Sequence, residues 1–364
     1  MRVVMARSKS PAGIEPRIDR EARALSKAGH EVNVLLWDRR MDHASEEERE
    51  GYTIIRCHLP APEGQIGLIP QMARWWLWEL RVLMKLRPDA VHSCDLDTAI
   101  PAILYAKITG RRLVYDIFDF YAYMIAQPIG AITKGILAKA ERFIARRADL
   151  VILADMARAV QLGGGVRGHI EEIMNVPEQT RLEESEEHEF TIFYGGMISE
   201  ERGLRQLVQA TSLAGAKLIV AGHGADEASL IPLFKQNPHV TFLGNIPYED
   251  VLRWTARCHL IGVLYDPAIP NNRLASPNKL FEAMMLSKPV ITNEGIRPAD
   301  IVRDIGCGLV VNYSDADALS GAIKKLMSSP ATRQEMGEKG RQAFEQRFNW
   351  TAMEKRLTVA YGSL

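Results

Sequence analysis

Short apolar blocks alternate with longer amphipathic stretches along the whole chain. The blocks hold about four to seven residues and predict buried strands, whereas apolar residues recur at helical spacing in the stretches between them. Strands that alternate with helices form βαβ units, which build parallel sheets. In the first half, the predicted strands cover 2–6, 31–37, 52–57, 90–93, 113–117 and 150–154, and the predicted helices cover 17–28, 69–86, 98–109, 131–147 and 156–162.

The same alternation begins again after an acidic run at 183–189, which we interpret as a solvated linker. The chain has 364 residues, enough for two α/β domains, each a Rossmann-like, doubly wound parallel sheet. Because such sheets bind ligands beyond the carboxyl ends of their strands, we expect the domains to face each other across a cleft that holds the site. The second set of predicted strands covers 191–194, 217–221, 240–243, 260–264, 289–292 and 308–311, and its helices cover 202–213, 225–235, 249–256, 279–286, 298–304 and 316–327.

Charge and cysteine content narrow the classes of partner. Lys+Arg and Asp+Glu both number 45, and a general nucleic-acid-binding protein would carry a basic excess, so we expect no nucleic-acid partner. The four cysteines form no C-x-x-C pair, which disfavours a disulfide framework or a zinc knuckle and indicates a reducing compartment. We find no signal peptide and no apolar run near the roughly 18 residues that a spanning helix needs. We therefore expect a cytoplasmic protein.

Two glycine turns follow predicted strands of the second half. The strand FTIFYGG ends in Gly195 and Gly196, and the strand KLIVAG continues into Gly222-His223-Gly224. Arg202 falls in the first turn of the helix after the first of these strands. Glycines let the backbone approach a ligand closely, and a helix N-terminus beside a guanidinium favours phosphate. The alternative is a tight turn with a surface arginine, but two turns on one sheet edge favour the phosphate site.

The segment SPNKLFEAMMLSKPVI, residues 276–291, is the sharpest signal in the chain. Ser276 and Pro277 predict a helix start, with serine or asparagine at the cap, directly before a buried strand. Lys279 and Glu282 are three residues apart and share one helix face, so a cation and a carboxylate can point into the same site. A surface salt bridge is the alternative to an anion-binding site.

These motifs resemble those of the family 4 retaining glycosyltransferases, which have the two-Rossmann B-type fold. Y-G-G followed by E-R-G, the G-x-G turn and S-P-N-K-L-F-E-A-M with K-P-V-I match the family's donor-nucleotide domain in order and spacing. The first half matches in PRIDREARALSKAGHEVNVL, PDAVHSCDLDT, RRLVYDIFDFY and the MNVP segment. The resemblance thus covers almost the whole chain.

The resemblance implies roles for individual residues. Glu282 corresponds to the second glutamate of the family's E-x7-E motif and is expected to hold the ribose hydroxyls of a donor nucleotide, UDP or GDP. Arg202 stands where the family usually has a lysine and is expected, with Lys279, to neutralise the donor diphosphate without a metal or other cofactor. Preorganised cations stabilise such a leaving group. The remaining expected donor-binding residues are Gly195, Gly196, Gly222, Asn278 and Leu280.

Three positions depart from the family pattern. The first glutamate of E-x7-E is replaced by Leu274, so Asn278 or nearby backbone would take over the contact to the donor sugar. Cys94 stands where a cleft histidine is common, and Phe118 interrupts the family's aromatic-acid motif. These departures put the donor-sugar contacts in doubt more than the nucleotide site.

Polar residues of the first half supply the expected acceptor side. Asp95-Leu96-Asp97 has the spacing of a D-x-D metal motif, but it follows a strand of the acceptor-side domain. We therefore expect Asp97 to cap the helix starting at Thr98, and Asp95 to contact sugar as a catalytic-site residue. Gly13, Arg17 and Asp119 are the expected acceptor-side residues, with an ordinary flexible connection as the alternative for the loop that holds Gly13.

Two helices of the first half are rich in basic residues. Residues 69–86 place Arg74, Trp78, Arg81 and Lys85 on one face. Residues 131–147 carry Lys134, Lys139, Arg142, Arg146 and Arg147 against Glu141. One interpretation is a solvated basic face, and the other is an interfacial surface that meets anionic lipid on the inner face of the cell membrane and a lipid-linked acceptor.

The sequence therefore predicts a retaining hexosyltransferase that uses a nucleoside-diphosphate sugar and a glycan or lipid-linked acceptor. We expect an acceptor-side domain over 1–178, a linker over 179–189, a donor domain over 190–347 and, as the resemblance implies, a helix over 348–364 that returns to the first domain. The alternatives are a nucleotide-sugar epimerase on a similar fold and a non-catalytic binding homologue. A nicotinamide dehydrogenase is disfavoured because the first turn lacks G-x-G-x-x-G. The oligomeric state stays open.

Overall fold

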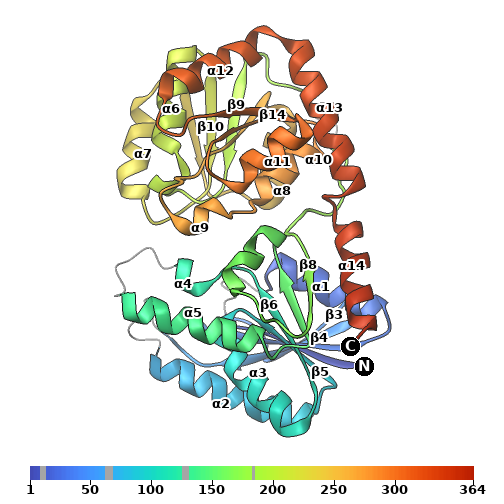
Figure 1. Ribbon diagram of the computed structural model, residues 1–364. Coiled ribbons are helices and arrows are strands. Elements are labelled where there is room, and N and C mark those ends of the chain that lie inside the picture. Colours follow the sequence, from blue (N-terminus) through green and yellow to red (C-terminus); the bar gives the residue numbers. More distant parts are fainter. Residues whose placement is uncertain (9–13, 62–68, 125–130, 183–184) are drawn as a thin grey trace. The chain divides into compact units, whose positions relative to one another are not determined.

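The computed structural model describes residues 1–8, 14–61, 69–124, 131–182 and 185–364. The chain divides into two compact units (Figure 1). The N-terminal unit comprises Met1–Met174 together with Met353–Leu364, and the C-terminal unit comprises Asn175–Ala352. Within the described residues, no helix has both the length and the apolar content needed to cross a bilayer.

The described part of the N-terminal unit is built on an eight-stranded sheet in the order β3-β4-β2-β1-β5-β6-β7-β8. β3 runs antiparallel to β4, and the other neighbouring strands are parallel. The strands are β1 Arg2–Arg7, β2 Glu31–Asp38, β3 Glu46–Arg49, β4 Tyr52–His58, β5 Ala90–Cys94, β6 Arg112–Ile117, β7 Leu150–Leu153 and β8 His169–Glu172. The helices are α1 Pro16–Lys27, α2 Ile69–Leu86, α3 Leu96–Thr109, α4 Tyr121–Met124, α5 Ala131–Ala145 and, from Met353 onward, α14 Trp350–Gly362, with a 3-10 helix at Met156–Leu162.

The described part of the C-terminal unit holds a six-stranded parallel sheet in the order β11-β10-β9-β12-β13-β14. Together the two units confirm the predicted fold class of two doubly wound α/β domains. The strands are β9 Thr191–Gly195, β10 Lys217–Ala221, β11 Val240–Gly244, β12 Leu260–Val263, β13 Val290–Asn293 and β14 Gly308–Val311. The helices are α6 Leu204–Ala214, α7 Glu227–Gln236, α8 Tyr248–Arg257, α9 Pro270–Arg273, α10 Asn278–Met285, α11 Arg297–Ile305, α12 Ala316–Ser328 and α13 Pro330–Gln346, with a 3-10 helix at Glu200–Arg202.

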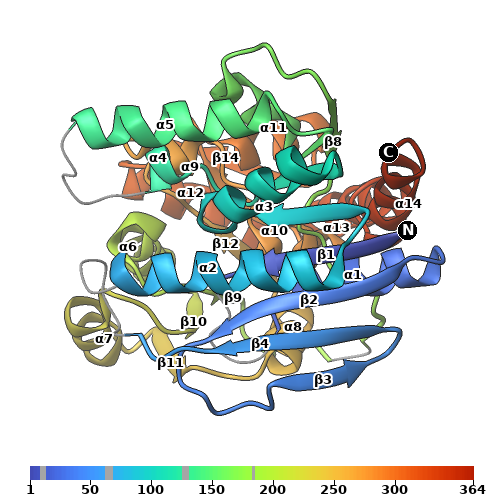
Figure 2. The ribbon, with the colours of Figure 1, turned by 90° about the horizontal axis from the view of Figure 1, so that it is seen from below.

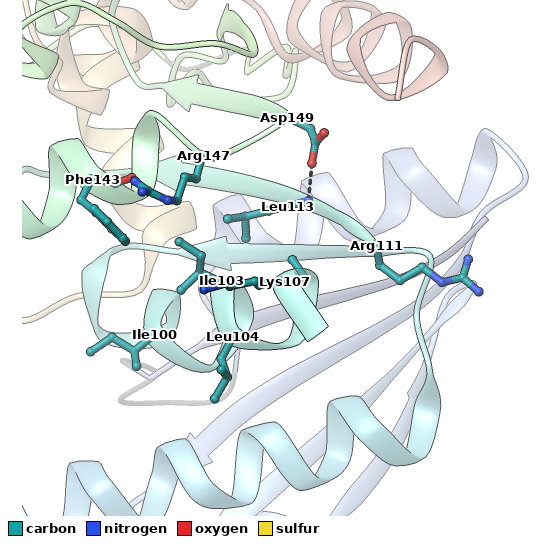
Figure 3. Close-up of a pocket in the computed structure, with 10 residues that line it drawn as sticks. Ile100, Ile103, Leu104, Lys107, Arg111, Leu113, Phe143, Arg147 and Asp149 are labelled. Atoms are coloured by element: carbon teal, nitrogen blue, oxygen red, sulfur yellow. Dashed lines mark hydrogen bonds between the residues drawn. The ribbon is translucent and has the colours of Figure 1, made fainter. Parts of the chain in front are cut away.

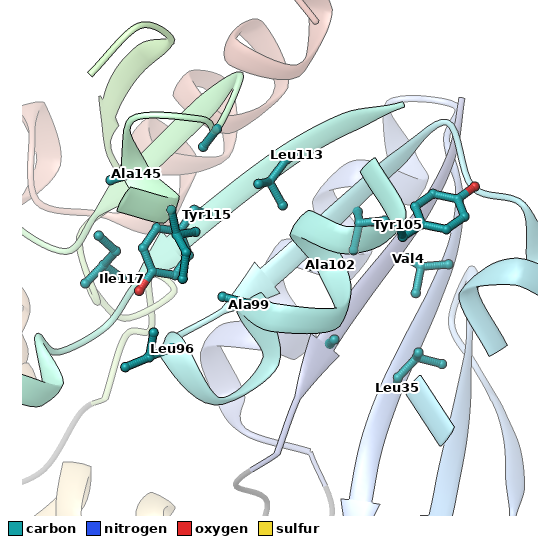
Figure 4. Packing of buried hydrophobic residues seen from close by; sticks show 14 of the residues in the cluster. Val4, Leu35, Leu96, Ala99, Ala102, Tyr105, Leu113, Tyr115, Ile117 and Ala145 are labelled. Atoms are coloured by element: carbon teal, nitrogen blue, oxygen red, sulfur yellow. The ribbon is translucent and has the colours of Figure 1, made fainter. Parts of the chain in front are cut away.

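Alternate residues of β5 and β6 divide the interior of the N-terminal unit into an apolar and a polar layer. Val91 and Tyr115 belong to the apolar cluster in which α3 packs on the sheet through Ala99 and Ala102 (Figure 4). His92 and Asp116, the next residues along each strand, point to the opposite face because side chains alternate along a strand. That face carries a buried polar network, which we describe below.

Several elements differ from those that the sequence predicts. The edge strands β3, with the sequence EEER, and β8, with the sequence HIEE, lack the apolar alternation by which strands are recognised. The helix α13 was not predicted either. Its surface is mostly polar, and its Gly337 and Gly340 allow close packing on the backbone of Ser287 and on Met284.

The acidic run expected to be a solvated linker is tied to the C-terminal unit. Glu186 accepts a hydrogen bond of 2.6 Å from Lys288 Nζ, and Glu187 pairs with Arg257. These contacts anchor the described part of the run, so it is not a freely solvated connection.

Candidate active site

The ends of strands β9 and β10 lie against each other through their glycines. Gly196 N donates to Ala221 O at 2.9 Å. Gly196 and Gly222 have φ angles of +147° and +139°, which favour glycine. A Cβ atom at Gly222 would lie 1.7 Å from Gly196 O, so a side chain there would collide with backbone. The two glycine turns thus form one continuous backbone surface.

A pocket of about 310 Å³ lies at this edge of the C-terminal sheet. A second hollow of about 290 Å³ contains Gly222 and His223 and shares Gly196 with the first. Leu280, which was predicted to bind the donor, lines neither hollow. Its side chain is buried in the core, so the prediction is wrong for this side chain. The predicted residues that line the first pocket are Gly195, Gly196, Arg202, Asn278, Lys279 and Glu282.

Two cations of the pocket rest on tyrosine rings. Lys279 Nζ lies 3.6 Å from the centroid of the Tyr194 ring, and Arg202 Cζ lies 4.4 Å from that of Tyr265. Such contacts hold a cation in place without neutralising it. Arg202 also pairs with Glu201, its Nη2 lying 3.2 Å from Glu201 Oε1. Burial and the Arg202 guanidinium lower the pKa of Lys279 well below its ordinary value, and Glu282 opposes that shift. Arg202 Nε is buried and has no hydrogen-bond partner among the described residues, so the pair is suited to bind an anion.

Glu282 lies on the same helix as Lys279, one turn further along. It is 4% exposed, and its Oε1 accepts a hydrogen bond of 3.0 Å from Tyr248 Oη. Tyr248 begins α8 and is itself exposed, so this contact fixes the glutamate at the rim of the pocket. The carboxylate is therefore placed to accept hydrogen bonds from hydroxyl groups of a ligand.

The start of helix α10 differs in one detail from the prediction. Pro277 occupies the cap position, no side chain caps the first turn, and Ser276 Oγ is buried with no hydrogen-bond partner among the described residues. Neither Ser276 nor Asn278 acts as the expected cap. The uncapped first turn adds its N–H groups to the positive side of the pocket.

In the N-terminal unit, Asp95 is a structural carboxylate. It is 3% exposed and has a φ of 65°, and its Oδ1 accepts a 2.9 Å hydrogen bond from Phe118 N. Its Oδ2 pairs with Arg7. These partners occupy both oxygens and tie the end of β5 to the loop after β6, so the expected sugar contact is replaced by a positioning role. Asp97 was predicted to cap helix α3, but the helix begins at Leu96, one residue before it. The Asp97 carboxylate accepts a hydrogen bond from Ser8.

Arg17, expected at the acceptor, instead lies inside the polar layer of the N-terminal unit. Its guanidinium donates to Glu21 Oε1 at 2.9 Å and to Asp116 Oδ1 at 2.8 Å. His92 Nδ1 lies 2.7 Å from the hydroxyl of Tyr361, which α14 supplies. Burial raises the pKa of both Glu21 and Asp116 to about 7 and lowers that of His92 to about 4. The network therefore holds fewer charges than its composition suggests.

The same network contains three atoms that have the spacing of metal ligands. The donor atoms of His92, Cys94 and Asp116 lie within 4.8 Å of one another, and all three residues are buried. However, Asp116 already accepts from Arg17, and burial raises the pKa of the Cys94 thiol well above its ordinary value, which disfavours a metal-binding thiolate. The internal ion pair explains this cluster better than a metal ion does. Metal independence stays a prediction.

The remaining acceptor-side predictions have different outcomes. Asp119 is partly exposed, and its Oδ1 accepts a 2.9 Å hydrogen bond from Arg158. It keeps the accessibility that a ligand contact would need. Gly13 lies outside the described residues.

Sequence analysis missed three tyrosines of the pocket, Tyr194, Tyr248 and Tyr265. Two of them follow from the same rule that found the glycines. Tyr194 directly precedes the glycine pair of β9, and Tyr265 lies just beyond the end of β12, so both stand at the carboxyl ends of parallel strands. Tyr248, at the start of α8, carries no comparable signal.

Two parallel-sheet α/β domains, with a cationic pocket at the strand ends of the second, define a transferase fold of the B type. Two family models match the chain. The model described as "Glycosyl transferase 4-like domain" matches residues 12–171, and the model described as "Glycosyl transferases group 1" matches residues 176–343. The chain therefore belongs to the family 4-like glycosyltransferases.

Individual relatives agree with this assignment. Over 184 residues the chain is 26% identical to the capsular polysaccharide biosynthesis glycosyltransferase CapM of Staphylococcus aureus, a match that covers 48% of this chain and 46% of that protein. The structure of sucrose-phosphate synthase from Thermosynechococcus elongatus has a TM-score of 0.81 at 17% identity and covers 100% of this chain and 98% of that chain. HepE of Anabaena, solved with UDP-glucose, has a TM-score of 0.72 at 17% identity over 100% of both chains. At these identities the structures show the fold alone.

Proposed function

We propose that this protein transfers a hexose-type sugar from a nucleoside-diphosphate sugar to a hydroxyl of a glycan or lipid-linked acceptor, with retention of the anomeric configuration. The observation that carries the proposal is the meeting of Arg202, Lys279 and Glu282 in one pocket at the strand ends of the C-terminal unit. The pocket offers two cations to a diphosphate and a carboxylate to a ribose. That HepE, of the same fold, was solved with UDP-glucose, and that CapM is named for polysaccharide biosynthesis, both support the proposal.

The two cations would act on the leaving group. As the bond between sugar and diphosphate breaks, negative charge builds on the phosphate oxygens, and preorganised cations stabilise that charge without reorganising. The rings of Tyr194 and Tyr265 hold the side chains of Lys279 and Arg202 in place. We expect the loss of either cation to lower the rate by about 10²–10³.

Retention is what the resemblance to family 4 implies, and the lining of the pocket bears on the route by which it would occur. Glu282 is the one carboxylate among the described residues that line it, and Tyr248 already holds it at the rim. A double displacement through an enzyme carboxylate therefore has little support in this pocket. Substitution from the front face, in which the departing phosphate takes the proton of the acceptor hydroxyl, needs only the cations described above.

A ligand panel with matched variants tests the donor site. UDP or GDP should raise the melting temperature of the protein, because a ligand that binds only the folded state stabilises it. Lys279→Ala should lose this shift while keeping its unliganded melting temperature. Arg253→Ala, which removes an exposed arginine of α8 outside the pocket, should keep it. If no nucleoside diphosphate shifts the wild type, the donor assignment is wrong.

Product analysis tests the reaction. With the donor and acceptor identified, NMR of the product should show the anomeric configuration of the donor, and chelation of divalent ions should leave the rate unchanged. An inverted product would refute retention, and an isomerised nucleotide sugar formed without acceptor would identify an epimerase instead. Donor binding without turnover on any acceptor would favour a non-catalytic homologue.

A further inference from the structure

Three helices of the N-terminal unit expose large apolar side chains next to one another. α2, α3 and α5 lie side by side over one face of the sheet (Figure 2). Ile132 is 81% exposed and Ile108 is 62% exposed, far beyond what packing against the sheet requires. The exposed apolar residues of α3 and α5 are Ile100, Leu104, Ile108, Ile132, Ile136 and Phe143.

The charge on these helices is one-sided. Their three acidic residues, Glu79, Asp97 and Glu141, are all buried, so none faces outward. The exposed charged residues of the helices and of the turns directly after α3 and α5 include Lys107, Lys139, Arg146 and Arg147, and α2 adds further basic residues. Arg111, after α3, is also exposed but pairs with Asp89. Because the whole chain has a formal net charge of zero, this excess of cations is a local property of the surface.

The surface is hollowed between α3 and α5. A groove of about 550 Å³ is lined by Ile100, Ile103, Leu104 and Phe143, among others (Figure 3). Lys107, Arg111 and Arg147 also line the groove, together with one carboxylate, Asp149, which pairs with Arg112. The Arg147 guanidinium stacks on Phe143, with its Cζ 3.5 Å from the ring centroid. Apolar walls and cationic side chains are thus combined within one groove.

The structure also corrects the expected face of α2. Trp78 is half-buried and stacks on Trp75, with ring centroids 5.2 Å apart, so it belongs to the interior. Leu77 and Met84 are exposed in its place, between the exposed Arg74, Arg81 and Lys85. This face of α2 therefore repeats the mixture of apolar and basic residues seen on α3 and α5.

We propose that the exposed faces of α2, α3 and α5, which we call the α2–α3–α5 surface, dock on a bilayer that contains anionic lipid. Apolar side chains that project among lysines and arginines enter the boundary between headgroups and acyl chains, while the cations bind the lipid phosphates. Exposed apolar patches of this kind mark interaction sites. Docking would bring the acceptor-side unit to a membrane that carries lipid-linked substrates.

Charge decides between a membrane and the other occupants of such a surface. A second copy of the chain, placed face to face, would bring two cationic surfaces together, and like charges in contact disfavour association. A nucleic acid would neutralise the cations but would leave the isoleucines without an apolar partner. An anionic bilayer satisfies both kinds of side chain.

Vesicle co-sedimentation tests the proposal. The wild type should sediment with vesicles of phosphatidylglycerol and phosphatidylcholine but not with phosphatidylcholine alone. Raising the salt from about 0.1 M to about 1 M, which shortens the screening length from about 10 to about 3 Å, should release much of the protein. Lys107→Glu combined with Lys139→Glu should lower the partition coefficient by at least about 25-fold, since each cation near such a surface contributes about fivefold.

Matched variants separate the surface from the rest of the molecule. Lys324→Glu combined with Lys325→Glu reverses two adjacent exposed cations of α12 and should leave binding unchanged. Ile132→Asn combined with Ile136→Asn should weaken binding, whereas Val359→Asn, at an exposed apolar position of α14, should not. All these positions are exposed, so the melting temperatures should stay near that of the wild type.

The proposal fails if the wild type does not sediment with anionic vesicles at low salt, or if the α12 control weakens binding as much as the Lys107 and Lys139 pair does. A concentration-dependent dimer that the Ile132 and Ile136 variant abolishes would assign the surface to a second copy instead. Vesicle binding does not depend on the donor pocket. Lys279→Ala should still sediment, which keeps this test distinct from that of the proposed reaction.

Discussion

Lys279 Nζ lies 3.6 Å from the centroid of the Tyr194 ring, so an amine carried by helix α10 rests on an aromatic face at the end of strand β9. The face of the ring attracts the amine but offers it no carboxylate or other acidic partner. Burial and the nearby Arg202 lower the pKa of Lys279, and a bound diphosphate would reverse that shift by supplying negative charge.

Diphosphate binding should therefore be coupled to proton uptake. Since the free protein has a lowered pKa at Lys279, its affinity for UDP or GDP should fall as the pH rises through that pKa. Calorimetry over a series of pH values, in two buffers of different ionisation enthalpy, should report the uptake as a difference in apparent binding enthalpy. Lys279→Arg should still bind without uptake, because a guanidinium stays charged. Equal enthalpies in both buffers for the wild type would contradict the prediction.

Glu282 should distinguish a ribose from its deoxy analogues. Its carboxylate lines the donor pocket and accepts from Tyr248 at 3.0 Å, and an ionised carboxylate has about four acceptor positions. Loss of a hydrogen bond to a charged group costs about 1.5–3 kcal/mol, so Glu282→Gln should lower nucleotide affinity by roughly 10- to 150-fold. The deoxynucleotide should bind the wild type and the variant with nearly equal affinity. An equal loss of affinity for the ribonucleotide and the deoxynucleotide would show that Glu282 does not contact the ribose.

Gly222 should not tolerate a side chain. It has a φ of +139°, and a Cβ would lie 1.7 Å from Gly196 O, so Gly222→Ala should destabilise the fold by at least about 2 kcal/mol. Nucleotide binding should be lost with it. Gly321 lies in helix α12 with open space around it, and Gly321→Ala should stabilise the protein by about 0.5–1 kcal/mol. Chemical denaturation of both variants measures the contrast, and similar effects in the two would refute it.

The buried network around Arg17 should make stability depend on pH. Burial raises the pKa of Glu21 from 4.5 to about 7, so between these values the folded state binds more protons than the unfolded state. The contribution of Glu21 to stability is therefore full at low pH and is lost as the pH rises toward 7. His92, with a pKa lowered to about 4, contributes in the opposite direction, and Asp116, with a pKa also raised to about 7, contributes in the same direction as Glu21. The comparison must therefore isolate Glu21.

The variant Glu21→Gln isolates this contribution because it keeps a neutral side chain of the same shape at every pH. Relative to this variant, the wild type should lose on the order of 1–3 kcal/mol between pH 4.5 and 7, measured by chemical denaturation. If the two proteins change in parallel, the Glu21 carboxyl does not titrate in this range.

Much of the fold was predictable because it depends on local pattern. The central strands, such as β1 and β6, are buried on both faces and read as apolar runs, and both were predicted close to their observed bounds. The edge strands β3 and β8 consist mainly of charged residues, because an edge needs few apolar contacts. Their pairing depends on the neighbouring strand and is not encoded in their own periodicity.

The donor pocket was predictable to the extent that its residues follow strands. Gly196 and Arg202 were found by the rule that parallel sheets bind ligands at the carboxyl ends of their strands. Lys279 was found instead from the helix start in the 276–291 segment. The rule failed for Asp95 and Arg17. Both follow strands of the N-terminal sheet, but their charged groups bond to internal partners. A residue's place along the chain does not tell whether its charge is already paired.

The sequence by itself determined the two doubly wound domains and the family, because hydrophobic periodicity and motif spacing are properties of neighbouring residues. Only the tertiary structure decided which polar groups are free to meet a ligand. His92 and Tyr361 are 269 residues apart and still meet at 2.7 Å, and Lys279 meets Tyr194 across 85 positions. Such pairs depend on how strands and helices pack. Packing brings together residues that are far apart in the chain, and neither the local pattern nor the spacing of these residues predicts that they meet.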